Sequence, residues 1–209
     1  VRDYGCDSLR MYELFVGPPE LDAEWDDRGI DGVYRFLNKF WSLVMDNKDK
    51  TVEPTKEMIK LRHRMVHTIT QRLESFNLNT VISGFMEYNN KMIEMAKKEG
   101  IDKETLETAV VLIAPFAPHL AEELWQELGH EESVFKNTWP EHDEDAMKDD
   151  EIEVPVQING KTKIVISIPA DISKEDAIAR GKEALGDKLT GNIIKEIYVP
   201  KKIINIVAK

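Results

Sequence analysis

Apolar residues recur every three or four positions through most of the first 140 residues, the spacing that gathers them on one face of a helix. Between Ile30 and Met45 this repeat is regular, and polar residues fall on the opposite side. The same pattern, with Asp, Pro and Gly at its breaks, predicts five further helices. They cover 7–15, 55–76, 80–98, 102–114 and 118–128. Long amphipathic helices with short connections predict a helical bundle.

The last sixty residues instead alternate between apolar and polar positions, which is typical of strands. Apolar side chains occupy even positions from Ile152 to Ile158 and again from Thr162 to Ile168. To keep them on one face, we expect a three-residue loop, 158–160, in which Gly160 is left-handed and Gln157 pairs with Lys161. Pro155 lacks a backbone donor, so the first strand is predicted at a sheet edge.

A capping box at Ser173 predicts a helix that ends near Leu185, and strands are expected over 193–199 and 203–207. The order β-β-α-β-β describes a small α+β domain. Acidic residues crowd the chain between Glu141 and Glu153, and like charges at this density repel one another. We therefore expect a solvated, flexible linker near 141–151.

Charge is distributed unevenly between these regions. The 209 residues have a net charge of −11. Residues 151–209 hold ten Lys/Arg and eight Asp/Glu, a net of +2, which leaves −13 for the rest. An acidic surface repels phosphate, so any contact with nucleic acid needs local basic patches. Cys6 is the only cysteine, and no apolar run reaches the ~18 residues of a membrane span, so we expect a soluble, cytoplasmic protein.

Basic residues form a strip on the predicted helix 55–76. Lys60, Arg64 and His67 belong to it, which makes it a candidate phosphate site, an ordinary solvated face or a contact for an acidic protein partner. His63 and His67 stand four residues apart, so a metal-dependent hydrolase stays open as an alternative, although Arg64 occupies the place of the glutamate in the zinc-protease motif. Arg62 falls among the apolar residues and needs a carboxylate or a route to solvent.

Other signatures of chemistry are missing from the sequence. It contains no phosphate-binding glycine loop and no nucleophile elbow. Trp25, Trp41, Trp125 and Trp139 are predicted to pack in the bundle core rather than to stack on bases. From patterns alone, the prediction is a helical bundle with a small α+β domain and no visible active site.

Several stretches of sequence point further. In chain order they are YGCDSLR at 4–10, APFAPHLAEELW at 114–125, Trp139-Pro140, VQINGK at 156–161 and IYVPK at 197–201. Together they resemble the C-terminal part of bacterial leucyl-tRNA synthetases. A lone cysteine and a β-rich tail match neither the zinc module common in the isoleucine enzymes nor the helical arm of the valine enzymes.

This resemblance implies a mostly α fold, in which a class Ia anticodon-binding helical bundle is followed by an α+β domain. Residues 1–24 would connect it to a KMSKS region, 25–145 would form the bundle and 151–209 the C-terminal domain. It implies docking of the body and corner of leucine tRNA, with no catalysis by these residues. ATP, Mg²⁺, the catalytic domain and the editing domain would belong to an upstream part of a monomeric ligase.

Docking on folded RNA requires cations for phosphates and donors for ribose hydroxyls. The expected tRNA-binding residues of the bundle are Arg35, Lys39, Lys60, Arg64 and His67. Those of the C-terminal domain are Lys161, Lys163, Lys201, Lys202 and Asn205. Asp7 and Arg10 are expected to fix the bundle to the catalytic domain. No metal ligand or cofactor site is expected in these residues.

Overall fold

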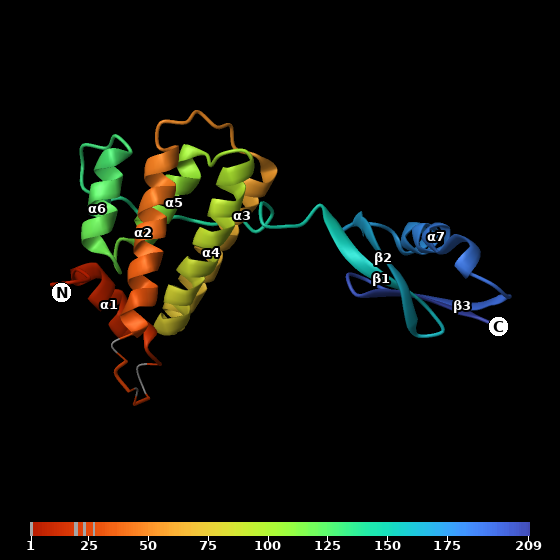
Figure 1. The fold of residues 1–209 in the computed structure, drawn as a ribbon. Helices are drawn as coiled ribbons and strands as arrows, with labels where there is room; N and C mark the ends of the chain where they lie inside the picture. Colours follow the sequence, from red (N-terminus) through yellow and green to blue (C-terminus); the bar gives the residue numbers. More distant parts are fainter. Residues whose placement is uncertain (1, 19–20, 23, 27) are drawn as a thin grey trace. The chain divides into compact units, whose positions relative to one another are not determined.

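The computed structural model describes residues 2–18, 21–22, 24–26 and 28–209. The chain divides into two compact units, one ending at Met147 and the other spanning Lys148–Lys209 (Figure 1). Each has its own apolar core. The expected mostly α fold with a small α+β domain is confirmed.

The first unit is a helical bundle, and each predicted helix is present within a few residues. The helices are α1 (Cys6–Phe15), α2 (Gly29–Asn47), α3 (Lys56–Glu74), α4 (Leu78–Lys98), α5 (Lys103–Ile113) and α6 (Pro118–Glu127), with a short 3-10 turn at Val134–Lys136. Helix α4 packs against α1, α2 and α3. Met11 and Tyr12 of α1 are buried in the bundle core, so the segment expected to be a connector contributes to this unit.

Three of the four tryptophans pack as predicted. Trp125 is buried, and Trp41 and Trp139 are partly buried against the same core. Trp25 is 54% exposed, so its assignment to the core was wrong. It lies outside the helices, where no apolar face directs it inward, and makes an edge contact with Tyr12.

Side chains cap the helices both locally and over long distances in sequence. Thr55 and Asp102 accept hydrogen bonds from the first turns of α3 and α5, as helix N-caps do. Asp7 does not cap its own helix. Its carboxylate accepts the Leu120 N–H at 2.8 Å and contacts His119 Nδ1 at 2.8 Å, so it caps α6 instead.

Arg10 also acts within the bundle. Its guanidinium donates to the Pro115 carbonyl at 3.2 Å, just before α6. Asp7 and Arg10 therefore tie α1 to the loop that opens α6. This role lies inside the unit, and their expected contact with a catalytic domain stays a prediction. At the other end of α2, Lys48 donates to Glu127 of α6 at 2.5 Å, and this bond raises the pKa of its ammonium above the ordinary 10.5.

The second unit is a four-stranded sheet with one helix. Its elements are β1 (Glu151–Ile158), β2 (Lys161–Pro169), α7 (Lys174–Leu185), a 3-10 turn at Gly186–Lys188, β3 (Ile193–Val199) and β4 (Ile203–Ala208). The strand order is β2-β1-β4-β3, with β1 and β4 parallel. Figure 1 shows α7 beside this sheet, and it contacts β2, β3 and β4.

The prediction that the first strand is an edge was wrong, because β1 is central. Its pairing with β4 begins at Val156 and ends at Ile158. Pro155 lies directly before the first paired residue. The proline is therefore accommodated because the parallel ladder is short, rather than because the strand faces solvent.

The hairpin loop also differs from the prediction. Ile158 pairs with Lys161, so the loop has two residues, and both Asn159 and Gly160 have positive φ. Such a turn matches the twist of a hairpin. The register shifts between Val156 and Gln157, which leaves Lys163 as an extra residue in β2. This bulge restores the alignment of even positions that the three-residue loop was meant to provide. Gly160 is left-handed, as predicted.

Candidate functional site

Part of the basic strip of α3 hydrogen-bonds to the chain's own acidic segment. His63 Nδ1 accepts the Asp143 N–H at 3.0 Å, and His67 Nδ1 lies 3.0 Å from His142 Nε2. Arg64 Nε donates to the Met147 carbonyl at 3.0 Å. The expectation of a flexible linker from residue 141 is therefore wrong for its first part, which hydrogen-bonds along α3. The sequence shows both charge runs but not that they meet.

Lys60 has a partner of its own. It donates to Glu57 at 2.7 Å, and its side chain is only 12% exposed. Together with Arg64 it lines a recess of about 410 Å³ between α3 and α4. Three glutamates share that recess, so its charge is mixed. For Lys60, Arg64 and His67, contact with RNA would require an exchange of existing partners.

Arg35 and Lys39 are placed differently. Both are exposed and stand one turn apart on α2, facing α4. Arg35 Nε donates to the backbone carbonyl of Asp31, and neither residue forms an ion pair in the described chain. They line a recess of about 210 Å³, and Lys39 also lines a second recess of about 440 Å³ further along the two helices. Lys50 and Lys97 line the second recess and were missed, because their approach depends on how α2 packs on α4.

The C-terminal cations lie in two places rather than one. Lys161 and the bulged Lys163 are at the β1–β2 hairpin, whereas Lys201 and Lys202 form the β3–β4 turn. Ile158 is paired with both Lys161 and Ile206, and Lys202 precedes Ile206 by four residues. At ~3.3 Å per residue, about 13 Å separates the two groups along the strand. All four lysines are exposed.

Asn205 has a structural partner. Its Oδ1 accepts the Gly160 N–H at 3.1 Å, which anchors the hairpin turn to β4. Asn159 completes this anchor, because its side chain exchanges hydrogen bonds with the backbone of Ala208 at 2.9 and 3.0 Å. Asn205 is thus grouped with Lys161 rather than with Lys201, although it follows Lys201 closely in sequence.

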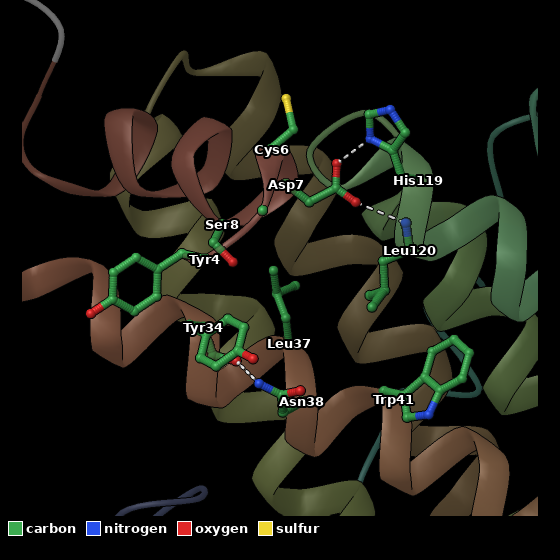
Figure 2. Close-up of a pocket in the computed structure, with 11 residues that line it drawn as sticks. Tyr4, Cys6, Asp7, Ser8, Tyr34, Leu37, Asn38, Trp41, His119 and Leu120 are labelled. Atoms are coloured by element: carbon green, nitrogen blue, oxygen red, sulfur yellow. Dashed lines mark hydrogen bonds and ion pairs between the residues drawn. The ribbon is translucent and has the colours of Figure 1, made fainter. Parts of the chain in front are cut away.

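Another recess in the bundle, of about 520 Å³, is lined by residues from the start of α1, from α2 and from the start of α6. Figure 2 shows Cys6, Asp7 and His119 together at one side of it, with Tyr34 and Trp41 among its other lining residues. A thiol, an imidazole and a carboxylate are the side-chain groups of a nucleophilic triad. Both oxygens of Asp7, however, serve the start of α6, and this geometry supports a helix cap.

A metal-dependent reaction has no support in the described residues. No group of three or more His, Cys, Asp or Glu side chains is arranged there to hold a metal ion. His63 and His67 instead bond to the segment that follows Pro140. Across the same residues, no helix is long and apolar enough to cross a membrane.

Comparison with known families gives these surfaces a context. Residues 55–178, more than half of the chain, match the family described as "Anticodon-binding domain of tRNA ligase". The chain belongs to this family. Membership agrees with the expected bundle and with the resemblance carried by the motifs at 114–125 and 156–161.

Curated relatives within the family match nearly the whole chain. A leucine–tRNA ligase of Fervidobacterium nodosum is 40% identical over 227 aligned positions, which cover 100% of this chain and 28% of that protein. One from Parabacteroides distasonis is 41% identical over 214 positions and covers 99% and 22%. The chain therefore spans about a quarter of the length of these relatives.

A solved structure is similar over the same extent. It is the ternary complex of Agrobacterium radiobacter K84 agnB2 LeuRS with tRNA and LeuAMS, with a TM-score of 0.78 and 28% identity. The alignment covers 100% of this chain and 29% of the LeuRS chain. Both units of this anticodon-binding family member thus have counterparts in one solved protein.

Proposed function

We propose that this chain binds leucine tRNA as the tRNA-docking part of a leucine–tRNA ligase. The observation that carries the proposal is the match of the whole chain to leucine–tRNA ligases, one of them solved together with tRNA. In that role the bundle and the sheet unit bind the folded RNA and make no covalent bonds. ATP, Mg²⁺, leucine activation and editing would then belong to the part of the relatives that this chain does not span.

Exposed cations would provide the contacts. Folded RNA presents phosphates and ribose hydroxyls more accessibly than base edges, so recognition of a tRNA body relies on charge and shape. The exposed cations Arg35 and Lys39 of the bundle have side chains available for phosphates, as have Lys161, Lys163, Lys201 and Lys202 of the sheet unit. Lys60, Arg64 and His67 would contribute only after leaving their present partners. Asn205 would act through the hairpin turn that it holds.

The proposal is tested by tRNA binding measured over a range of salt concentrations. We expect the chain to bind leucine tRNA, with an affinity that falls as salt rises. The slope of log affinity against log salt should be shallower by ~1.8 in Lys201→Ala/Lys202→Ala, because each phosphate that is no longer neutralised reduces it by ~0.9. Lys174→Ala/Lys188→Ala removes two exposed lysines of the same unit and is the matched control. Absence of tRNA binding by the wild-type chain at low salt would refute the proposal.

A protein-interaction module is the competing function. The basic face of α3 already hydrogen-bonds to the backbone of the chain's own acidic segment, at Asp143 and Met147. If an acidic polypeptide rather than tRNA binds this chain, affinity should fall in an Arg64→Ala variant. The Lys201→Ala/Lys202→Ala variant should then be unaffected. The tRNA proposal expects the reverse order of effects.

A further inference from the structure

The two recesses between α2 and α4 form a single feature that we call the α2–α4 groove. One recess, of about 210 Å³, is lined by Gly32, Arg35, Lys39, Asn89 and their neighbours. The other, of about 440 Å³, extends along the same helices. Lys39 lines both, so the two are adjacent. The groove lies entirely within the bundle.

Unpaired cations gather in this groove. Arg35, Lys39, Lys50 and Lys97 line it, whereas Asp46 is its only carboxylate among the described lining residues. In the described chain none of the four cations has a carboxylate partner, and Lys50 donates only to the Asn47 amide. Several other cations of the bundle have a carboxylate partner, as Lys48 has in Glu127 and Arg62 in Asp102. These four cations and Asp46 give the groove a net charge of +3, within residues 1–150, whose net charge is −13. This local positive charge marks a site for a polyanion.

Asn89 supplies a second, independent observation. It lies in the wall of the smaller recess and is 1% exposed. Among the buried side-chain polar atoms that the structure describes, its Oδ1 is the one without a hydrogen-bond partner. Buried polar atoms in native proteins are nearly always paired, so an exception beside a recess indicates a ligand group. An acceptor next to two cations fits a ligand that carries both a donor and a phosphate.

We propose that the α2–α4 groove binds a stretch of RNA backbone, with phosphates on Arg35, Lys39, Lys50 and Lys97 and a donor of one nucleotide bonded to Asn89. This inference rests on the proposed tRNA binding and adds the face that performs it. The donor is a ribose 2′-hydroxyl or a base N–H, since both are hydrogen-bond donors of a nucleotide. The strip on α3, part of which bonds to residues 142–147 of the chain itself, is not this face.

Gly32 offers a way to block the smaller recess. A Cβ at this position would meet no atom within 4 Å, and the glycine is in ordinary helical conformation within α2. A larger side chain can therefore occupy the recess without straining the backbone. Since glycine is a poor helix former, Gly32→Leu should preserve or raise the stability of the bundle while it excludes the nucleotide.

The charge component is tested by tRNA affinity and its salt dependence in two double variants. We expect Lys39→Ala/Lys97→Ala to bind leucine tRNA at least tenfold more weakly and to reduce the log-log slope by ~1.8. Lys91→Ala/Lys98→Ala is the matched control, because it removes two exposed lysines of α4 that line the α3–α4 recess. Its affinity for tRNA should remain within about threefold of the wild-type value, because dissolved ions screen the attraction between the RNA and charges far from it. Equal losses in both variants would overturn the inference.

The recess is tested by Gly32→Leu and Asn89→Leu, each checked for an unchanged helical circular-dichroism spectrum. Both should weaken tRNA binding several-fold without changing the salt slope. Binding of single-stranded RNA and single-stranded DNA of the same sequence identifies the donor. If Asn89→Leu weakens the binding of RNA only, the donor is the 2′-hydroxyl. If it weakens the binding of both, the donor is a base N–H. If all groove variants bind tRNA like the wild type, this inference fails and tRNA docking stands. If the wild-type chain binds no tRNA, the proposed function itself fails.

Discussion

At the scale of single residues, Arg62 and Asp102 show how a charge is held inside the bundle. Arg62 lies on the apolar side of α3 and is 8% exposed. Its guanidinium is 3.3 Å from Asp102 and 2.7 Å from Glu104. Asp102 also accepts the Thr105 N–H and hydroxyl at 3.0 and 2.6 Å. One buried carboxylate thus neutralises Arg62 and caps α5.

Removing that carboxylate should be costly. We expect Asp102→Ala to lower the free energy of unfolding by ~3–5 kcal/mol, because it leaves a buried cation poorly paired. Glu104→Ala, which removes the exposed partner of the same arginine, should cost less than ~1 kcal/mol. Urea denaturation followed by circular dichroism measures both. Similar losses in the two variants would show that Asp102 has no special role.

Asn205 leads to a second prediction at this scale. Because it holds the Gly160 N–H, Asn205→Ala should destabilise the sheet unit by ~1 kcal/mol. It should leave the salt dependence of tRNA binding unchanged, since no charge is removed. Thermal unfolding and filter binding separate the two effects. A reduced salt slope in this variant would contradict the structural role.

The contrast between Arg62 and Asn205 shows what the sequence reveals about individual side chains. A charge within an apolar stripe demands a carboxylate or a route to solvent, and for Arg62 the structure supplies the carboxylate, whose identity the sequence does not reveal. The partner of Asn205 is 45 residues away. Its bond depends on the pairing of β4 with β1, which local patterns do not determine.

At the scale of secondary-structure elements, the tie between α1 and α6 depends on one carboxylate. Asp7→Ala should cost about 1–2 kcal/mol, the usual range for removal of an N-cap. The exposed Asp49, near the end of α2, gives the control Asp49→Ala, expected within about 0.5 kcal/mol of the wild type. Chemical denaturation measures both, and hydrogen exchange at the Leu120 amide should quicken only in Asp7→Ala. An unchanged Leu120 amide would contradict capping by Asp7.

The sheet illustrates where pattern reasoning fails for elements. Alternation identified all four strands and their order with α7, since it depends only on which face is buried. The predicted loop length was wrong because a bulge within β2 can align the even positions of the two strands as well as a longer turn can. The position of β1 was wrong because a proline excludes pairing only where its nitrogen would donate, and the ladder with β4 starts one residue later.

At the scale of the whole molecule, the contact between the α3 strip and the acidic segment is the largest difference between the predicted and the observed surroundings of the candidate site. The sequence shows a basic face and an acidic run separated by some 75 residues. Their contact arises only in the folded chain. Because it occupies residues of α3, the α2–α4 groove is the more accessible basic surface of the bundle. The acidic segment therefore lies along α3 through hydrogen bonds in addition to joining the two units.

The two units should unfold as separate cooperative transitions. Their cores share no residue: Leu124 belongs to the bundle core and Val156 to the sheet core, and each is fully buried. Leu124→Ala should cost the bundle ~2–5 kcal/mol and Val156→Ala should destabilise only the sheet unit, because each cavity is felt by the packing around it. Residue-resolved hydrogen exchange on the intact chain reports each unit separately. If either substitution lowers protection equally in both units, the chain folds as one cooperative body, and tRNA docking must then involve a single rigid surface.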